Sequence, residues 1–355
     1  MQSFLVFAQF IFAVALLILV HELGHFIAAK LVGIQVKELG IGFPPRIAHL
    51  FSRGGTDFTL NWIPLGGFVR PAGENDPELS GGFSAASPWA RLVMLAAGPA
   101  MNFLAALVLF TIIFAQLGRP DFSTVVIQDV STDSPAAIAG LQAGDIVLEI
   151  DNQEVGGSQE LHDLIYANLG EPIDLLYSRD GRVSSVSIIP RDPPPEEGAI
   201  GIAMGNPSIP IGSGEALYYG GQAITTQVQA LVSLPGRLIS GELSADQGRL
   251  VGYKGMYDIY TEVRQADAEP SADLPSGTNT LAFFASISVS LALLNLMPIP
   301  ALDGGRILFT LPEIIFGKRI PPAYENMINV VGLALLFLLV IYVNVQDFIN
   351  PVIAP

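Results

Sequence analysis

Cysteine is absent from this chain of 355 residues, and histidine occurs only four times. Without cysteine the chain can form neither disulfides nor thiolate metal sites, so a bound metal would need histidine, aspartate or glutamate as ligands. Charged residues are also scarce, at 14%, whereas 50% of the residues are hydrophobic and the mean hydropathy is +0.50. Soluble globular domains are rarely so apolar. The composition therefore predicts an integral membrane protein.

Four apolar runs are long enough to cross a lipid bilayer, which takes roughly 20 residues. They occupy about 4–29, 92–117, 280–300 and 327–346. The first run has no basic segment before it and continues into His21 rather than into a small-residue cleavage site. We therefore interpret it as a retained span and not as a signal peptide. The predicted fold class is an α-helical polytopic membrane protein with about four transmembrane helices.

Positive charge is unevenly distributed between the connections of these spans. Lysine and arginine recur in the connections 30–91 and 301–326, whereas segment 119–275 holds 8 basic and 23 acidic residues. Because basic loops favour the cytoplasmic side, we expect those two connections in the cytoplasm, and segment 119–275 and both termini outside the cell membrane. The acidic character of that segment also argues against nucleic acid as a partner.

Two of the four histidines lie inside the first apolar run. His21 and His25 are four residues apart, and Glu22 follows the first. On a helix, positions i and i+4 share one face, so both imidazoles can bind one zinc ion while Glu22 acts on a water molecule. A chance match to this HExxH pattern in such a chain has a probability on the order of 10⁻³. The pattern predicts a zinc protease site inside a membrane span.

A catalytic zinc site usually has three protein ligands, so one more is needed. The other two histidines, His49 and His162, fall in segments where we expect surface residues. Asp303 follows the third apolar run, after Pro298 and Pro300, which would interrupt a helix. An ionisable residue at that depth indicates a functional site, although Asp303 could instead cap the next helix. The HExxH helix needs a partner, and this favours Asp303 as the third ligand.

The connection after the first span has the pattern of a β-hairpin. Two strand-like runs, 46–51 and 56–63, flank the turn sequence 52–55, and residues 64–69 extend the second run. The hairpin could simply connect two spans. Alternatively, it dips toward the membrane, where its edge could pair with an extended peptide. The residues leave both possibilities open.

Segment 122–190 has the pattern of a compact soluble module. We expect strands and one helix at 124–130, 146–150, 173–177, 183–189 and 158–169. At its centre, Ser-Pro-Ala-Ala at 134–137 and Ala-Gly-Leu-Gln-Ala-Gly-Asp-Ile-Val at 139–147 resemble a PDZ domain of the kind found in bacterial proteases. The alternative is another small β domain with glycine turns. A PDZ domain would bind peptide by strand addition.

The proline-rich segment 191–197 is predicted to close this module as a stiff linker. A helix expected at 215–239 is too polar to span a membrane, so it would lie on the outer membrane surface or fold over the spans. We therefore expect an N-terminal membrane core, a PDZ domain, an extracytoplasmic linker with a surface helix, and a C-terminal membrane core. Their predicted bounds are 1–118, 119–192, 193–276 and 277–355.

Three motifs together resemble the site-2 protease family of intramembrane zinc metalloproteases. They are the HExxH motif at 21–25, Gly-Pro-Ala-Met-Asn at 98–102, and the run 295–304 that contains Asp303. With the PDZ-like insert, the resemblance covers essentially the whole chain and is greatest to the bacterial branch that cuts membrane-bound anti-sigma factors and remnant signal peptides. It implies four spans, a membrane-associated β-hairpin, an inserted extracytoplasmic PDZ domain, and an active site in the membrane near the cytoplasmic face.

The resemblance also implies a role for individual residues. It places the zinc ligands on His21, His25 and Asp303 and the general base on Glu22, with Zn²⁺ as the cofactor. Four further residues are implied near the substrate or the catalytic centre: Asn295, Asn102, Gly66 and Gly67. The two glycines belong to the hairpin, which would hold the substrate extended. The implied partners are single-span membrane protein substrates, peptide C-termini at the PDZ domain, and the lipid bilayer.

Two features depart from the family pattern. The chain has one PDZ module where some relatives have two, and residues 251–256 stand in place of a family element near the surface helix. A non-catalytic PDZ-containing membrane scaffold or chaperone is the alternative function, and a zinc transporter is a third. A scaffold has no need of His, Glu, His and Asp at one membrane depth. Four spans with a single site also offer a transporter no translocation path.

Overall fold

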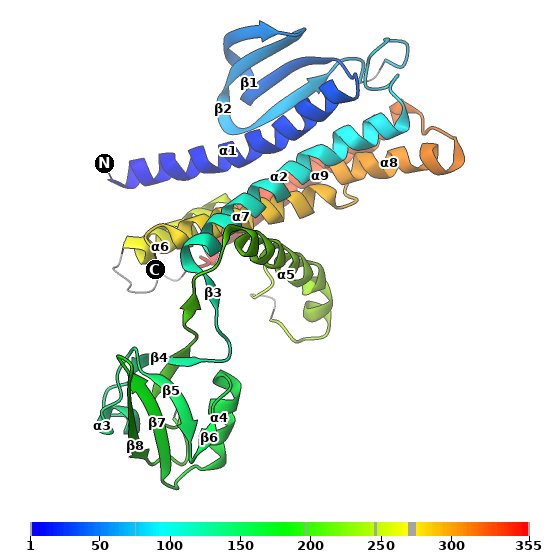
Figure 1. Ribbon diagram of the computed structural model, residues 1–355. Helices are drawn as coiled ribbons and strands as arrows, with labels where there is room; N and C mark the ends of the chain where they lie inside the picture. Colours follow the sequence, from blue (N-terminus) through cyan, green and yellow to red (C-terminus); the bar gives the residue numbers. More distant parts are fainter. Residues whose placement is uncertain (1, 75, 196, 245–246, 269–274, 354–355) are drawn as a thin grey trace. The chain divides into compact units, whose positions relative to one another are not determined.

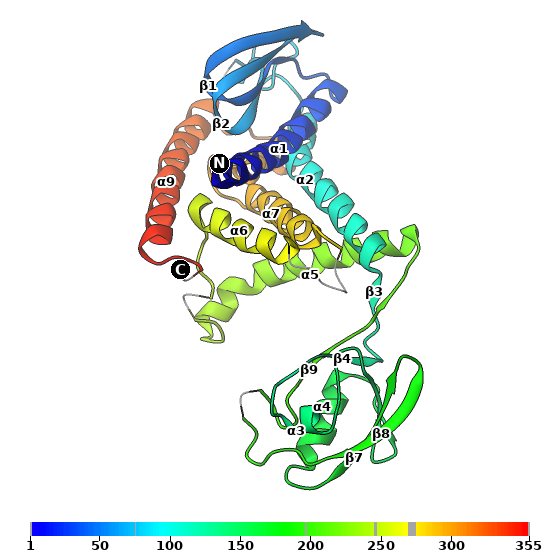
Figure 2. The same ribbon diagram turned by 90° about the vertical axis from the view of Figure 1, so that its left-hand side faces the viewer.

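The computed structural model describes residues 2–74, 76–195, 197–244, 247–268 and 275–353. The chain divides into two compact units (Figures 1 and 2). The first, here called the membrane unit, comprises residues up to Phe114 and from Ser213 onward. The second, here called the inserted unit, comprises Ala115–Gly212. Each unit has its own packing and is described separately.

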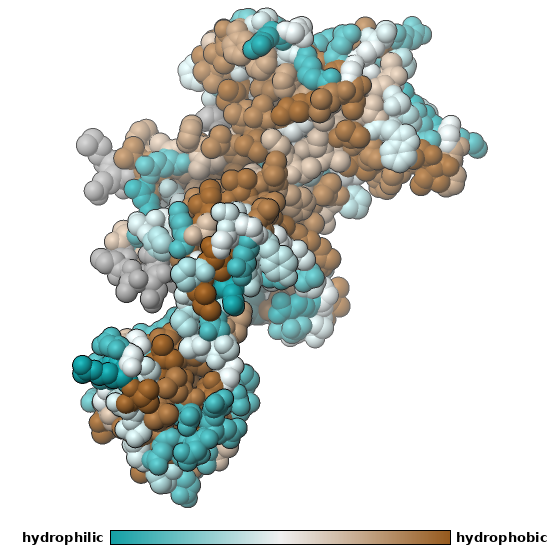
Figure 3. Space-filling view, in the orientation of Figure 1, coloured by the Kyte–Doolittle hydropathy of each residue, from teal (hydrophilic) through white to brown (hydrophobic). Residues whose placement is uncertain are grey.

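Four long apolar helices correspond to the four predicted runs (Figure 1). They are α1 Gln2–Leu31, α2 Pro88–Leu117, α7 Thr278–Leu296 and α9 Pro322–Ile349. Each is long and apolar enough to cross a membrane, which confirms the prediction of four such helices. Hydrophobic residues cover much of the visible surface of the membrane unit (Figure 3). α7 ends before the predicted residue 300 because Pro298 and Pro300 cannot continue a helix.

The predicted hairpin is present and longer than expected. It consists of β1 Val36–Arg53 and β2 Thr56–Pro71, and both strands bend so that they form a curled antiparallel sheet beside α1 (Figure 2). Residues 38–41 of β1 pair on one side with 57–60 and on the other with 67–70 of β2. Residues 67–70 are therefore at an edge of this sheet.

Glu38 holds three segments of this sheet together. Its buried carboxylate accepts hydrogen bonds from Thr59 Oγ1 at 2.8 Å and from Arg46 at 2.7 Å, and it pairs with Arg70 at 3.0 Å. Burial on its own raises the pKa of this carboxyl, but the hydrogen bonds from Thr59 and Arg46 and the charge of Arg70 lower it overall. The charged carboxylate thereby fixes the edge segment to the rest of the sheet.

A tight turn after α7 leads into a shorter helix, α8 Asp303–Phe316. Gly304 lies so close to the carbonyl oxygens of Leu296 and Met297 that a Cβ at this position would overlap both. At its other end, Glu313 of α8 pairs with the buried Arg91 of α2. These contacts fix the first residue of α8, Asp303, at the end of the third span.

Two further helices complete the membrane unit. α5 Ser213–Ile239 corresponds to the predicted helix at 215–239, whereas α6 Tyr253–Ala268 was not predicted. Tyr257 and Tyr260 of α6 pack against Phe10 of α1 at ring distances of 5.7 and 5.6 Å. α6 therefore packs against α1, the helix that carries the HExxH motif.

The segment before α6 is fixed to the last span by a buried carboxylate. Asp347 of α9 is fully buried, and its Oδ1 lies 2.6 Å from Arg249 Nη2. Its Oδ2 accepts hydrogen bonds from the backbone N–H groups of Gly252 and Gly255, at 2.8 and 3.0 Å. The segment 251–256, to which the sequence assigned no function, is thus the attachment of α6 to α9.

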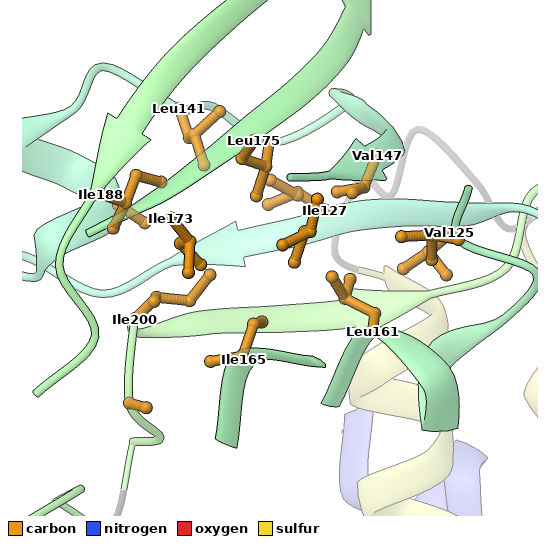
Figure 4. Packing of buried hydrophobic residues seen from close by; sticks show 14 residues of the cluster. Val125, Ile127, Leu141, Val147, Leu161, Ile165, Ile173, Leu175, Ile188 and Ile200 are labelled. Carbon is orange, nitrogen blue, oxygen red and sulfur yellow. The ribbon is translucent and has the colours of Figure 1, made fainter. Parts of the chain in front are cut away.

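The inserted unit is a small β domain with two helices. Its elements are β3 Arg119–Pro120, β4 Val125–Val130, α3 Pro135–Ile138, β5 Ile146–Ile150, β6 Gln153–Glu154, α4 Ser158–Ala167, β7 Ile173–Arg179, β8 Arg182–Ile188, β9 Ile202–Gly205 and β10 Ser208–Ile209. The main sheet has the order β8-β7-β5-β4-β9, with β6 paired to β5. Leu161 and Ile165 of α4 pack with Val125, Ile127 and Ile173 in its core (Figure 4).

The sheet of this unit extends beyond residue 192, the predicted end of the module, because the chain returns to the sheet after the proline-rich segment 191–197. Met204 of β9 pairs with Ile127 of β4, and Ile209 of β10 pairs with Arg119 of β3. Those prolines therefore lie in a loop inside the unit rather than in a linker that closes it.

Candidate metal centre

His21, His25 and Asp303 meet in the membrane unit, although Asp303 lies 282 residues after His21 in the sequence. Asp303 Oδ2 is 3.1 Å from His21 Nε2 and 3.2 Å from His25 Nε2, and the two Nε2 atoms are 3.1 Å apart. Both imidazoles are buried. Among the described residues, these three offer ligand atoms that all lie within 4.8 Å of one another.

The arrangement follows from the local structure of each element. His21 and His25 are one helical turn apart on α1, so their rings project on the same side. Asp303 is the first residue of α8, and no side chain caps that helix at Leu302. The Asp303 carboxylate lies against the Nε2 atoms of the two histidines instead. Asp303 therefore does not cap α8, which was the alternative to its role as a ligand.

The backbone of α2 closes one side of the centre. A Cβ at Gly98 would overlap His25 Nε2 and would lie 2.8 Å from His21 Nε2. One turn earlier, the carbonyl oxygen of Met94 accepts a hydrogen bond from His25 Nδ1 at 2.8 Å. Because a carbonyl can only accept, Nδ1 of His25 carries a proton, and Nε2 is the ring atom that faces Asp303.

Glu22 lies beside the edge of the β-sheet. A Cβ at Gly67 would stand 3.3 Å from Glu22 Cγ and 3.0 Å from the carbonyl oxygen of Gly40. The backbone of Val69 in β2 also interacts with the Glu22 carboxylate. Gly66, with φ of +147°, packs against the ring of Phe43. The structure thus brings Gly67, and not Gly66, against the side chain of Glu22 in the HExxH motif.

The two asparagines have different surroundings. Asn102 is fully buried, and its Nδ2 lies 3.2 Å from His21 Nδ1. Asn295 is half-buried, and its Nδ2 donates to the carbonyl oxygen of Leu291 in its own helix at 2.9 Å. In the described part of the chain, no hydrogen bond joins Asn295 to the histidines or to Asp303. The predicted role of Asn295 at the substrate stays a prediction.

The remaining histidines lie elsewhere, as expected. His49 Nε2 is 2.9 Å from Ser52 Oγ in the β-hairpin, and the ring of His162 stacks on Tyr166 in α4 at a centroid distance of 4.0 Å. The centre therefore has two imidazoles and one carboxylate. This donor set and its close spacing fit a zinc ion, which takes three protein ligands at a catalytic site and keeps one position open.

Comparison with known proteins identifies the family. The sequence matches Peptidase family M50 over residues 9–339. The chain belongs to this family, the site-2 proteases. A protein of Clostridium perfringens that bears the name of a zinc metalloprotease is 32% identical over 352 residues, which cover 99% of this chain and 100% of the relative. Zinc metalloprotease RasP of Oceanobacillus iheyensis is 27% identical over 429 residues, which cover 95% and 97%.

A solved structure covers a smaller part. The crystal structure of a PDZ domain from Listeria monocytogenes is 28% identical, covers 24% of this chain and 92% of that chain, and has a TM-score of 0.21.

Membership in the M50 family makes this chain a zinc metallopeptidase and a hydrolase with Zn²⁺ as its cofactor. Together with the four apolar helices, it also makes the chain a multi-pass membrane protein. The cluster of His21, His25 and Asp303 is the place in this M50 protein where the described residues fit the metal.

Sequence reasoning missed one contact at this centre. The carbonyl of Met94 orients His25, but no side chain is involved and no residue pattern indicates it. Gly98 is different, because it belongs to the 98–102 motif although no role was predicted for it. The requirement for glycine becomes clear only from the overlap that a Cβ would make with the imidazoles.

Proposed function

We propose that this M50 protease hydrolyses peptide bonds within or near the transmembrane segments of single-span membrane proteins, such as anti-sigma factors or remnant signal peptides. The observation that carries the proposal is the position of the metal cluster: two of its residues are on α1, a helix apolar enough to cross a membrane. The basic connections support an active site near the cytoplasmic face of the cell membrane. The acidic inserted unit and both termini are then extracytoplasmic.

The proposed chemistry assigns one task to each side chain. His21, His25 and Asp303 would hold zinc, which when bound supplies Lewis acidity for the scissile carbonyl and lowers the pKa of a water molecule toward about 7. Glu22 takes a proton from the attacking water and delivers it to the leaving amine. The carboxylate is next to His21 in sequence, on the neighbouring face of α1, where it can act as this base.

We further propose that the substrate binds as an added strand at the edge segment 67–70. A helical substrate must first unwind, because its carbonyl groups are otherwise occupied by intrahelical hydrogen bonds. Residues 67–70 pair with β1 on one side only, and Gly67 lies against Glu22. A strand paired to this edge would run past the catalytic carboxylate. Gly66, Gly67 and Asn295 would contact that strand.

The inserted unit is proposed to act as a PDZ domain that binds peptide C-termini. Strand β9 is at the end of the main sheet, so one of its sides is available for strand addition. Just before it, the carbonyls of Ile200 and Gly201 accept hydrogen bonds from Ala136 and Ser131. In the described residues, no hydrogen bond has the N–H of Ile200 or Gly201 as its donor. Two consecutive free amides suit a terminal carboxylate.

The decisive experiment replaces the proposed base while leaving the metal ligands intact. Glu22→Gln should retain zinc, measured as metal per protein in purified protein, and should lose cleavage of a reporter transmembrane segment. Full cleavage by this variant would remove the protease mechanism. It would favour the alternative, a membrane scaffold or chaperone that binds peptides through its PDZ domain without catalysis.

A further inference from the structure

Asn102 occupies an unusual position at the metal centre. Its side chain is fully buried in α2, and its only hydrogen-bonded neighbour among the described side chains is the Nδ1 atom of His21, 3.2 Å from its Nδ2. Its side-chain oxygen, Oδ1, is buried and has no hydrogen-bond partner in the described structure. The single acceptor atom of this amide is therefore available to bind a donor nearby.

The two histidines need the same support. For an imidazole to present the Nε2 lone pair to a cation, its Nδ1 must carry the proton, and a buried N–H requires an acceptor. His25 meets this condition through the carbonyl oxygen of Met94. Among the residues that the structure describes, no backbone carbonyl is hydrogen-bonded to His21, and the group that faces its Nδ1 is the amide of Asn102.

An asparagine amide can serve either as donor or as acceptor at one position. Its oxygen and nitrogen exchange places when the amide turns by about 180°, and the hydrogen-bond partners decide which orientation holds. With Nδ2 toward His21, the imidazole must accept at Nδ1 and its proton lies on Nε2, directed at Asp303. With Oδ1 toward His21, Nδ1 donates and the Nε2 lone pair is directed at the cluster.

We propose that Asn102 is a positioning residue for zinc: in the metal-bound protein, its Oδ1 accepts the Nδ1 proton of His21 and so holds His21 Nε2 toward the ion. This inference rests on the proposed zinc site but concerns metal binding rather than substrate contact. The backbone at residue 102 is itself fixed, because its carbonyl accepts a hydrogen bond from Ser288 Oγ of α7 at 2.9 Å.

The proposal makes the two histidine ligands unequal. The orientation of His25 depends on a main-chain carbonyl, which no substitution at position 94 removes. The orientation of His21 depends on a side chain, so it is open to mutation at a single position. Loss of a hydrogen bond that orients a metal ligand typically weakens metal affinity about 10–100-fold.

Three variants of the full-length protein in detergent test this inference by zinc affinity, measured in competition with a metal-binding dye. Asn102→Ala removes the acceptor and should weaken zinc binding about 10–100-fold. Asn102→Asp keeps an acceptor oxygen and should bind within about threefold of the natural chain. Thr111→Ala is the control, because it removes the hydrogen bond from Thr111 Oγ1 to the carbonyl oxygen of Leu107 on the same helix, at 2.6 Å, without touching residue 102 or the imidazoles, and it should bind zinc normally.

Unchanged zinc affinity in Asn102→Ala would overturn the proposal, as would equal weakening in the Ala and Asp variants. Nitrogen NMR of the zinc-loaded natural chain gives an independent answer if Asn102→Ala fails to fold. The proposal expects His21 protonated at Nδ1, and a proton on Nε2 would contradict it. These measurements do not involve cleavage, so they are separate from the Glu22→Gln test of the protease mechanism.

Discussion

Gly67 of the β-sheet edge lies directly against Glu22 of α1, where a Cβ would approach Glu22 Cγ to 3.3 Å. Two elements that are separate in the sequence, a membrane helix and a hairpin strand, therefore share one narrow space. A residue at 67 with a larger side chain would compete for the space that Glu22, the proposed base, and a bound peptide require.

We therefore expect Gly67→Val to lower kcat/KM for a reporter substrate by at least about tenfold, equivalent to about 1.4 kcal/mol in the activation barrier. Zinc content should stay unchanged, since a Cβ at Gly67 would meet Glu22 and none of the three proposed metal ligands. Gly221→Ala is the control, because a Cβ there meets nothing within 4 Å. Normal cleavage by Gly67→Val would show that the substrate does not pass this edge.

Gly98→Ala should act on the metal instead. Its Cβ would overlap His25 Nε2 and crowd His21 Nε2, so the two imidazoles could no longer converge. We expect zinc affinity to fall by about 100-fold or more, at the upper end of the effects known for residues around metal ligands. Metal analysis after dialysis measures this. Full zinc occupancy in Gly98→Ala would mean that α2 moves away to accommodate the added methyl group. The backbone of α2 would then not determine the positions of the two imidazoles.

Asp347→Asn should loosen the attachment of α6 to the last span. The substitution leaves Arg249 without its charged partner in a largely buried place, which typically costs about 3–5 kcal/mol. The melting temperature in detergent should fall, and the segment 249–255 should become sensitive to added protease. The double variant Arg249→Met/Asp347→Asn should be less destabilised than the sum of the single changes. Strictly additive effects would contradict a direct pairing.

The inserted unit should lose stability in acid. Burial on its own raises the pKa of the Asp145 carboxyl, but hydrogen bonds from Arg179 and the Gln142 backbone N–H outweigh it, so the pKa lies below the ordinary value of 3.8. The ionised form therefore stabilises the fold fully above about pH 4, and this contribution disappears as the pH falls through the native pKa.

Urea unfolding of a fragment spanning 115–212, at several pH values, measures this effect, because the unit has its own core. Asp145→Asn should be less stable at pH 7 and should lose part of the pH dependence. If both proteins show the same change of unfolding free energy with pH, Asp145 is not the source of the acid sensitivity.

The sequence predicts those parts of the molecule that depend on neighbouring residues. Apolar runs mark α1, α2, α7 and α9 because a span needs about 20 apolar residues in succession. The HExxH pattern places two ligands on one helical face by spacing alone. The position of Asp303 could be inferred because prolines in an apolar run are unusual and the surrounding motif is specific.

Other parts depend on contacts between residues far apart in the sequence. The sequence does not indicate that the inserted unit continues past residue 192, because the pairing of β9 with β4 joins residues about 75 apart, and the prolines at 193–195 resemble a linker. α6 is polar, and its attachment to Asp347 has no pattern in the sequence. The contact of Asn102 with His21 likewise arises only when α1 and α2 pack together.

The separation of His21 and Asp303 by 282 residues also has a consequence for biosynthesis. The ribosome adds about 5–20 residues per second, so the helix with the HExxH motif exists for tens of seconds before Asp303 is made. During that time the proposed metal centre lacks its carboxylate. If the proposed ligand set is correct, we expect the growing polypeptide to have no peptidase activity until Asp303 has been synthesised.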